Sequence, residues 1–367
     1  MEKLKIGIVG CGGNAIVKHL PALMKLPDIC EIVAFCDIAK DKAYNAAKKF
    51  GSSDAKAYSD YFEMFQNKSI DVVYILLPNV MHCPATVAAF EAGKHVMCEK
   101  PMAHTVADAQ LMMNAWKKSG KQFTIGYQNR FRPEVQALYR ACKADELGDI
   151  YFAKAHAIRR RGVPTWGVFT NKALQGGGPL IDIGTHALDL TLWMMDNYEP
   201  ESVTGSVYYK LGNLLQATEG NVFGPWDPGT FEVEDSAFGM IKMKNGATII
   251  LEASWALNIL DSKEEATTLC GTKAGAEIRS GMSYKKDELI INRGHLGHLV
   301  EEYISTTGTV AYSDGVSTDP GFLETKQWLE AIINGTKPLV DPEQAFVVTQ
   351  ILEAIYESAE TGKTVYF

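Results

Sequence analysis

A glycine-rich turn near the start of the chain constrains its fold more than any other feature. The apolar segment 4–9 runs into Gly10-Cys11-Gly12-Gly13-Asn14-Ala15, and residues 15–24 then have helical character. The first glycine permits a sharp turn, the second lets the main chain approach a pyrophosphate, and a small third residue allows close helix–strand packing. The turn predicts a strand–turn–helix unit that binds a dinucleotide at the helix N-terminus. The residues expected to hold it are Gly10, Gly12, Gly13, Asn14 and Ala15.

An acidic residue follows the second predicted strand. Residues 32–36 are apolar and strand-like, and Asp37 comes directly after them. A carboxylate at this place accepts hydrogen bonds from the ribose hydroxyls and repels a 2′-phosphate. Asp37 therefore favours NAD as the cofactor, while the nearby Lys40 and Lys42 leave NADP possible.

The first third of the chain alternates short apolar strands with helices. Strand-like segments at 72–77, 95–98 and 122–126 alternate with helical segments at 40–50, 85–92 and 105–119. This alternation predicts an α/β domain with a doubly wound parallel sheet, because right-handed crossovers place helices on both faces. We assign residues 1–127 to this domain.

The pattern changes near residue 130. Segments 150–161, 202–210, 236–243 and 247–255 have alternating character, and Asn245-Gly246 between the last two predicts a type I′ hairpin. We expect residues 128–367 to form an α+β domain on a large, open, mostly antiparallel sheet. Helices are predicted at 322–333, before the helix stop Gly335, and at 343–360, and they could pack back on the first domain. A half-exposed sheet can be covered by a second copy, so a homo-oligomer is expected.

Composition excludes several classes of protein. The length of 367 residues suits two domains, and a net charge of −8 without a long Lys/Arg run argues against nucleic-acid binding. Seven cysteines without a Cys-x-x-Cys pair indicate reduced thiols and no zinc site. The two histidines of the predicted loop 294–298 are weak support for a metal, and none is expected. No segment is long and apolar enough for a signal peptide or membrane span, which predicts a soluble cytoplasmic protein.

Two segments lie at predicted carboxyl ends of strands, where open α/β sheets bind ligands. The first contains Pro78, Asn79 and His82, which are expected to line the nicotinamide half of the cofactor; for Asn79, helix capping is the alternative. The second is Glu99-Lys100-Pro101. The proline restricts Lys100 to extended backbone, which could aim its ammonium group into the cleft to hold a substrate oxygen and relay a proton. For this tripeptide taken alone, a solvated surface lysine is the preferred interpretation of Lys100.

A third segment, residues 176–189, combines three glycines with acidic and imidazole groups. Asp182 and His186 are four residues apart, so in a helix they share one face. A carboxylate can orient an imidazole, and a neutral imidazole can take a hydroxyl proton. The triple glycine 176–178 is expected to allow a close approach of the main chain to a ligand, and Asp189 to be structural.

Together these motifs resemble the Gfo/Idh/MocA oxidoreductase family. The resemblance covers nearly the whole chain and is carried by the glycine turn, Asp37, Glu99-Lys100-Pro101, Asn129-Arg130-Phe131 and Asp182-x-x-x-His186. It implies a Rossmann domain paired with a domain on an open sheet that usually mediates dimers or tetramers. It also implies that Lys100, Asp182 and His186 are catalytic, and that Glu99 and Asn129 lie near the nicotinamide.

The reaction expected from this set is reversible hydride transfer between a secondary alcohol and the nicotinamide ring. His186 acts as general base, while Lys100 and Asp182 position the substrate, and no metal is needed. Arginine donors and a tryptophan face in the segment 159–169 suit a sugar, glycoside or cyclitol, with position 3 of a pyranoside suggested by the family alone. Expected substrate contacts, besides the catalytic residues, are Gln128, Arg160 and Trp166, although ordinary packing is the alternative for Trp166.

Two other functions remain open from the sequence. Some relatives are NAD-dependent glycoside hydrolases that oxidise their substrate only transiently. A non-catalytic sensor that binds the cofactor is the third possibility, although the intact set Lys100, Asp182 and His186 argues against it.

Overall fold

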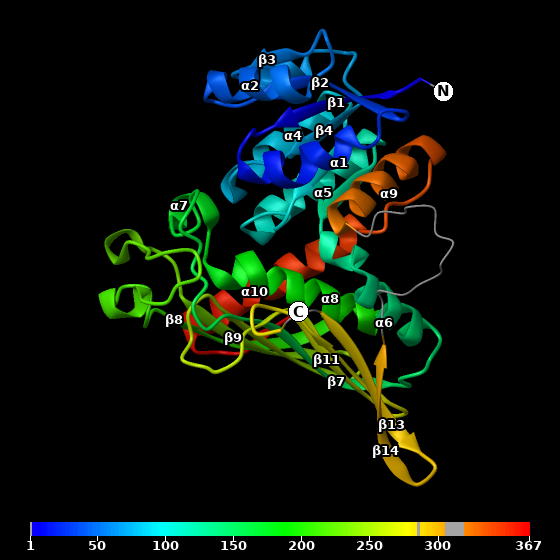
Figure 1. Ribbon diagram of the computed structural model, residues 1–367, viewed down its shortest axis with the longest axis vertical. Helices are drawn as coiled ribbons and strands as arrows, with labels where there is room; N and C mark the ends of the chain where they lie inside the picture. The colour runs from blue at the N-terminus through cyan, green and yellow to red at the C-terminus, as the bar shows by residue number, and fades with distance from the viewer. Residues whose placement is uncertain (1, 285–286, 305–318) are drawn as a thin grey trace. The chain divides into compact units, whose positions relative to one another are not determined.

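The computed structural model describes residues 2–284, 287–304 and 319–367 (Figure 1). The chain divides into two compact units, each described by itself below. The first unit contains Met1–Phe131 and Ser317–Phe346, and the second contains Arg132–Val316 and Val347–Phe367.

Within the described residues, the first unit is built on a six-stranded parallel sheet of order β3-β2-β1-β4-β5-β6. Its strands are nearly continuous apolar runs because both faces are covered by helices. The order reverses beside β1, and such a switch point is where open α/β sheets bind ligands. The strands are β1 (Leu4–Val9), β2 (Cys30–Cys36), β3 (Lys56–Tyr58), β4 (Val72–Ile75), β5 (His95–Glu99) and β6 (Phe123–Gly126). The predicted doubly wound sheet is confirmed.

The helices of the first unit pack on this sheet and on each other. Trp328 and Leu329 of α9 are at most 1% exposed and join the apolar cluster around β1. Burying a side chain of this size contributes about 1.5–3 kcal/mol. Gly335, at φ +64°, ends α9 as predicted. The helical elements are η1 (Ala15–His19), α1 (Leu20–Met24), α2 (Lys40–Phe50), α3 (Tyr61–Phe65), η2 (Asn79–Met81), α4 (His82–Glu91), α5 (Val106–Ser119), η3 (Gln128–Phe131) and α9 (Pro320–Asn334).

The second unit is built on a nine-stranded sheet, counted over the described residues, of order β14-β13-β12-β11-β7-β10-β9-β8-β15. Only the pair β7–β10 is parallel, and all other described neighbours are antiparallel, so the predicted large, mostly antiparallel sheet is confirmed. The strands are β7 (Ile150–Ile158), β8 (Pro200–Tyr208), β9 (Ser236–Met243), β10 (Thr248–Ser254), β11 (Lys263–Gly271), β12 (Gly275–Arg279), β13 (Glu288–His295), β14 (His298–Ile304) and β15 (Val365–Tyr366).

Helices cover one face of this second sheet (Figure 1). On β10, Ile249, Leu251 and Ala253 are fully buried, while the alternate residues are partly exposed. On β8 and β9, the paired Gly205 and Gly239 leave room for Ile355 of α10. The helical elements are α6 (Pro133–Lys143), α7 (Lys172–Gln175), η4 (Leu180–Gly184), α8 (Thr185–Met195), η5 (Leu215–Thr218), η6 (Pro228–Thr230) and α10 (Pro342–Thr361), of which α10 begins in the first unit.

Two turns differ from their sequence predictions. The Asn245-Gly246 hairpin is present, but of the two residues only Gly246 has a positive φ, so the turn is not type I′. Gly246 N instead donates to Met243 O at 2.8 Å, which closes a type I turn followed by a left-handed glycine. Conversely, the expected loop 294–298 is the end of a hairpin between β13 and β14, whose central Leu296 and Gly297 both have positive φ.

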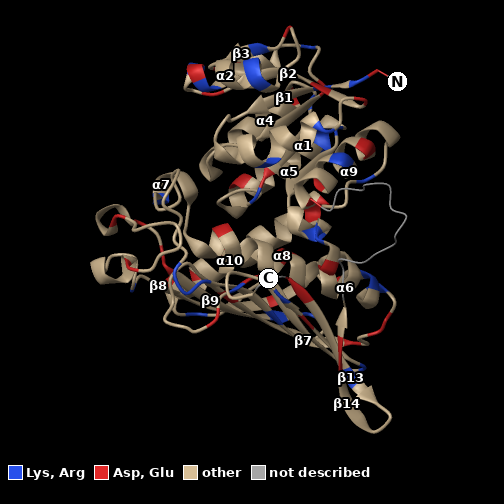
Figure 2. Cartoon of the chain, in the orientation of Figure 1, with Lys and Arg blue, Asp and Glu red and all other residues tan. Residues whose placement is uncertain are grey.

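The surface and the thiols agree with the composition. Figure 2 shows Lys and Arg interspersed with Asp and Glu along the elements of both units. All seven cysteines are free, and five of them are buried. Among the helices that the structure describes, none combines the length and apolar character needed to cross a bilayer.

Candidate active site

The glycine turn follows β1 directly. Gly10 has φ +95°, and a Cβ on it would lie 2.3 Å from the carbonyl oxygen of Leu76, so only glycine fits. Gly12 and Gly13 are exposed, and a Cβ on either would meet no atom within 4 Å. Ile16 N donates to Gly12 O at 3.1 Å, which starts the helix at the turn. This open, amide-bearing helix start fits the pyrophosphate of a dinucleotide.

The residues around the turn complete this part of the site. Ala15 is 1% exposed and packs against the sheet, while Asn14 is exposed. Asp37, after β2, accepts a hydrogen bond from Cys11 N at Oδ2 and from Ala39 N at Oδ1, both at 2.9 Å. The carboxylate is thereby held beside the glycine turn, where each oxygen keeps a lone pair for a ribose hydroxyl.

The segment after β4 holds the loop that contains Lys100. His82 is 1% exposed, with Nδ1 2.8 Å from Pro101 O and Nε2 2.9 Å from Leu77 O. Burial lowers the pKa of His82. Pro78 and Asn79 are partly exposed, and Asn79 is the first residue of η2, with Met81 at the N-cap of α4. The alternative that Asn79 caps α4 is therefore wrong.

Glu99 is held inside a buried charged cluster. The carboxylate is 5% exposed, and its Oε1 lies 2.7 Å from both Lys18 Nζ and His19 Nε2. Its Oε2 accepts a hydrogen bond from the main-chain N of Lys100 at 3.0 Å. Glu99 thus holds the main chain at Lys100, whose side chain is partly exposed and whose peptide bond to Pro101 is cis.

Lys18 connects this cluster to other elements of the first unit. Its Nζ lies 3.0 Å from Glu324 Oε2 on α9 and donates to Gln128 Oε1, also at 3.0 Å. Burial opposes the charge of Lys18, but Glu324 and Glu99 outweigh it and raise the pKa of Lys18. Burial likewise opposes ionisation of Glu99, yet Lys18 and His19 hold the pKa of Glu99 well below its ordinary value.

Two further predicted residues lie on η3. Asn129 is 5% exposed, while Gln128 is partly exposed and accepts a hydrogen bond from Lys18 Nζ. The predicted substrate contact of Gln128 would thus come from a residue that already belongs to the charged cluster.

In the second unit, Asp182 and His186 lie one turn apart on a continuous helix. Asp182 belongs to η4, which is a π-helical turn, and His186 to α8. Single π turns are frequent at functional sites. Asp182 Oδ2 accepts from Trp255 Nε1 at 3.1 Å, and this tryptophan, which directly follows β10, is fully buried. Asp182 is partly exposed and His186 is 4% exposed.

The triple glycine serves the protein's own packing. A Cβ on Gly177 would lie 2.1 Å from Tyr356 Oη, and one on Gly178 would lie 2.3 Å from Glu234 O. Glu234 accepts from Gly178 N at 2.8 Å, Leu180 N at 3.2 Å and Tyr356 Oη at 2.8 Å. The expectation that these glycines approach a ligand is wrong for Gly177 and Gly178, because Glu234 and Tyr356 fill that space.

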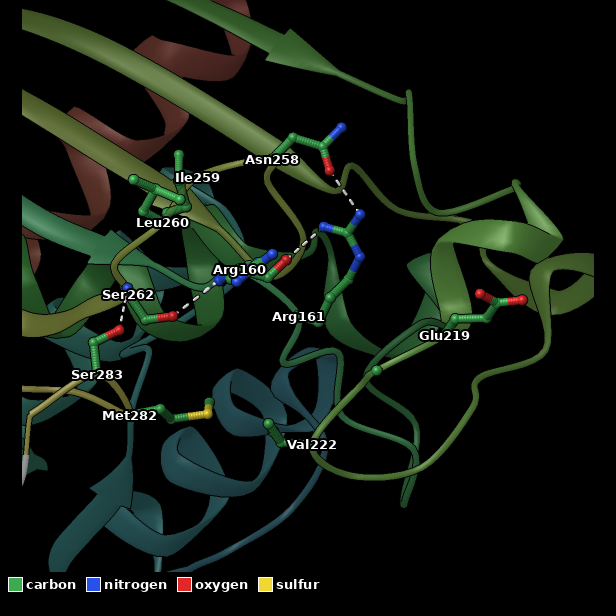
Figure 3. A pocket seen from close by; sticks show the side chains of 11 residues that line it. Arg160, Arg161, Glu219, Val222, Asn258, Ile259, Leu260, Ser262, Met282 and Ser283 are labelled. Atoms are coloured by element: carbon green, nitrogen blue, oxygen red, sulfur yellow. Dashed lines mark hydrogen bonds between the residues drawn. The ribbon is translucent and has the colours of Figure 1, made fainter.

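The remaining predicted substrate residues lie beyond the end of β7. Arg160 is exposed and lines a cavity (Figure 3). Trp166 is 52% exposed, with its ring 4.8 Å from that of Phe223 and 5.9 Å from that of Phe169. Trp166 thus forms T-shaped contacts with both rings and keeps about half of its surface exposed.

Sequence reasoning missed the residues that support the site. Lys18 and His19 followed the glycine turn in a helical segment, but their partner Glu99 is 80 or more positions away. The partners of Asp182 and Gly178, Trp255 and Glu234, are similarly distant in the chain. No local signal identifies such pairs. Lys100 belongs to the first unit, and Asp182 and His186 belong to the second.

Comparison with known proteins agrees with this architecture. Residues 4–127 match the model of an oxidoreductase family with an NAD-binding Rossmann fold, and residues 140–367 match the C-terminal alpha/beta domain of that family. The D-glucoside 3-dehydrogenase of Escherichia coli is 38% identical over 99% of this chain and 97% of its own length. The inositol 2-dehydrogenase of Salmonella typhimurium is 27% identical over 78% of this chain and 80% of its own.

A solved structure shows the same fold over the full length. The aldose-aldose oxidoreductase of Caulobacter crescentus superposes with a TM-score of 0.80 at 25% identity and covers 100% of both chains. With both family models matched in order along the sequence, the chain belongs to the Gfo/Idh/MocA family of NAD-binding oxidoreductases.

Proposed function

We propose that this NAD(P)-dependent oxidoreductase of CH–OH groups oxidises the C3 hydroxyl of a D-glucoside, with NAD as the preferred cofactor. The observation that carries the proposal is the 38% identity, over 99% of the chain, to a D-glucoside 3-dehydrogenase. A second relative, the glucose-6-phosphate 3-dehydrogenase of Bacillus subtilis, is 30% identical over 59% of the chain.

In this proposal the first unit holds the cofactor. The exposed Gly12 and Gly13 and the helix start receive the pyrophosphate, and Asp37 receives the ribose hydroxyls. The nicotinamide end is bordered by residues at the carboxyl edge of the sheet: Pro78, Asn79, His82, Glu99, Lys100 and Asn129. When bound, NAD supplies the acceptor for the hydride.

The reacting hydroxyl is handled by three side chains. His186 takes the hydroxyl proton as the C–H electron pair leaves carbon and the C=O bond forms. Lys100 donates a hydrogen bond to the same oxygen, and Glu99 holds the main chain from which Lys100 extends. Asp182, oriented by Trp255, accepts from a neighbouring sugar hydroxyl and keeps the ring in place.

A substrate panel tests the activity. Methyl D-glucosides, free hexoses and inositols are offered with NAD and NADP, and reduced cofactor is followed by absorbance. We expect methyl D-glucoside with NAD to give the highest kcat/KM. Reduction of the product with borodeuteride should place deuterium at C3, as read by NMR. Deuterium at another carbon, or higher kcat/KM on inositols, contradicts the proposal. A hydrolase that recycles its cofactor would release the aglycone without stoichiometric NADH.

The catalytic roles are tested by Lys100→Ala and His186→Ala. Each should lower kcat by about 10²–10⁴-fold, the usual contribution of positioned acid–base groups. Lys118→Ala and His298→Ala, both at exposed positions, serve as matched controls. Near-normal turnover of both site variants would refute the catalytic roles of Lys100 and His186.

We also propose that the second sheet pairs with a second copy to form a homodimer or homotetramer. The face away from α8 and α10 carries Tyr208, Phe238, Met240 and Ile250 on adjacent strands, with Met240 50% exposed. Light scattering after gel filtration measures the state, and Met240→Lys should shift it toward monomer. A monomeric wild-type protein would refute this part.

A further inference from the structure

A cavity of about 790 Å³ lies in the second unit, beyond the ends of β7 and β10 (Figure 3). The strand pairing continues past both strands, because Arg159 N donates to Ser254 O and Gly162 N donates to Trp255 O. Leu257 N also donates to Arg159 O at 3.1 Å, and beyond these contacts Arg160 and Asn258 line the cavity.

The cavity is close to the catalytic helix within this unit. Trp255, whose indole donates to Asp182, precedes the wall residue Asn258 by three positions. Three residues of chain span at most about 10 Å, the scale of one sugar ring with its glycosidic bond. The cavity is therefore within reach of a substituent on a sugar held at Asp182.

A row of aromatic rings leads from Trp255 to the segment that lines the cavity. The Phe169 ring lies 6.3 Å from that of Trp255, Trp166 lies 5.9 Å from Phe169, and Phe223 lies 4.8 Å from Trp166. Phe223 directly follows Val222, which lines the cavity. The rings thus connect Trp255, the partner of Asp182, to the segment beside Val222, and aromatic rings suit the apolar faces of sugars.

Part of the cavity lining is apolar. Val222, Leu260 and Met282 are 55%, 83% and 43% exposed, so they leave apolar surface to water around one hollow. Such surface, when it lines a cavity, marks a binding site more often than isolated exposed residues do.

The polar part of the lining is hydrogen-bonded and leaves the Arg160 guanidinium available among the described residues. Arg160 N donates to Ser262 Oγ at 3.0 Å, and Ser262 N donates to Ser283 Oγ at 2.7 Å. The Arg161 guanidinium is engaged by Arg160 O and by Asn258 Oδ1, at 2.6 and 2.7 Å. The guanidinium of Arg160 has no hydrogen bond or ion pair with residues 2–284, 287–304 or 319–367.

We propose that this cavity binds the aglycone of the glucoside, and that the aglycone is aromatic. The inference rests on the proposed function and names the substrate class more closely. A planar ring fits this lining because a free guanidinium stacks on aromatic faces, a thioether contacts ring edges, and aliphatic side chains cover the rest. Arg160 can also donate a hydrogen bond to the oxygen of a phenolic aglycone. Free glucose has no aglycone and would not make this contact.

The experiment compares phenyl and methyl D-glucosides, as both anomers, with NAD. For the wild-type protein we expect kcat/KM for the better phenyl glucoside to exceed that for methyl glucoside by about tenfold or more. In the Leu260→Ala/Met282→Ala double variant that ratio should fall to about twofold, mostly through KM. Leu215→Ala, a similarly exposed leucine outside the cavity, should keep the wild-type ratio. Leu260 and Met282 are exposed enough that the double variant should fold, which thermal denaturation checks.

The outcomes separate this inference from the proposed function. Oxidation of methyl glucoside without a preference for phenyl glucoside, or a ratio that the double variant leaves unchanged, overturns the aglycone site alone. If no glucoside is oxidised, the proposed function fails, and calorimetry with phenyl glucoside and the NADH-loaded protein still tests the cavity. Saturable binding that the double variant weakens at least fivefold supports the site, and its absence overturns it.

Discussion

Each unit of the protein contains a buried glutamate that binds the main chain beside a proposed catalytic residue, and the two glutamates are stabilised in opposite ways. Glu99 in the first unit binds Lys100 N, is neutralised by Lys18 and accepts a hydrogen bond from His19. Glu234 in the second unit binds Gly178 N and Leu180 N ahead of Asp182, and its third donor is the hydroxyl of Tyr356. The exposed fractions are 5% and 1%.

The difference appears in their ionisation. Opposite charges outweigh burial at Glu99 and lower its pKa, whereas burial outweighs the neutral donors at Glu234 and raises its pKa. A charged partner thus keeps a buried carboxylate ionised, while amide and hydroxyl donors alone leave a residual cost of burial. Both act as positioning residues, so their loss should affect stability and geometry together.

The largest effect is expected from Lys18→Met. The change leaves Glu99 and Glu324 buried without their cation, and breaking a buried ion pair in this way costs about 3–5 kcal/mol. Thermal denaturation should show a fall in Tm of about 10 °C or more. Lys25→Met is the control, because its ion pair with Asp319 is about half exposed on both sides and is worth less than about 1 kcal/mol. Equal shifts in the two variants would refute the role of the cluster.

The next largest effect is expected from crowding the glycines beside Glu234 in the second unit. Gly177→Ala places a methyl group against Tyr356 Oη and should cost about 1–3 kcal/mol of stability and lower kcat by shifting the helix that carries Asp182. Tyr356→Phe should relieve part of this cost, giving a coupling of about 1 kcal/mol in a double-mutant cycle. Gly178→Ala meets the main-chain oxygen of Glu234 instead, so Tyr356→Phe should not rescue it. Identical behaviour of the two alanine variants would contradict this packing.

The pH dependence of stability should separate the two glutamates. Because the pKa of Glu99 is lowered, its stabilising contribution is present above pH 4.5 and is lost as the pH falls below that value. Because the pKa of Glu234 is raised, its contribution is present below pH 4.5 and is lost as the pH rises through the raised value. Tm measured from about pH 2.5 to 9 should therefore have a shallower acid limb in Glu99→Gln and a flatter decline above pH 4.5 in Glu234→Gln. A steeper acid limb in Glu99→Gln, or a steeper decline above pH 4.5 in Glu234→Gln, would contradict the difference between the two glutamates.

The smallest effect concerns His95 in the first unit. Burial and Lys121 lower the pKa of His95 to about 4, so its contribution to stability is lost as the pH falls from about 6.5 to 4. His95→Asn keeps an acceptor for Gln122 N and should reduce the loss over this interval by about 1 kcal/mol, after allowance for solvent screening. Urea unfolding at pH 7 and pH 5 measures it, with the exposed His298→Asn as control. An unchanged pH dependence in His95→Asn would refute the assignment.

Local chemistry decided what could be predicted from the sequence. The glycine turn, the Asp37 that ends the second strand and the four-residue spacing of Asp182 and His186 are short-range patterns, so they indicated a dinucleotide fold and a helical pair directly. The parallel sheet followed from continuous apolar runs, and the open sheet from alternation. The turn at Asn245-Gly246 was mispredicted because the same dipeptide fits a type I turn with a left-handed glycine.

The sequence by itself therefore determined the fold family, the nicotinamide chemistry and the candidate catalytic residues Lys100, Asp182 and His186. The tertiary structure alone decided what holds them: Lys18 and His19 on Glu99, Trp255 on Asp182, and Glu234 with Tyr356 against the glycines. It also decided that Lys18 and Asp182 lie on π-helical turns, at Ala15–His19 and Leu180–Gly184. The physical reason is that these contacts join residues tens of positions apart, and their free energy depends on burial that no local pattern encodes.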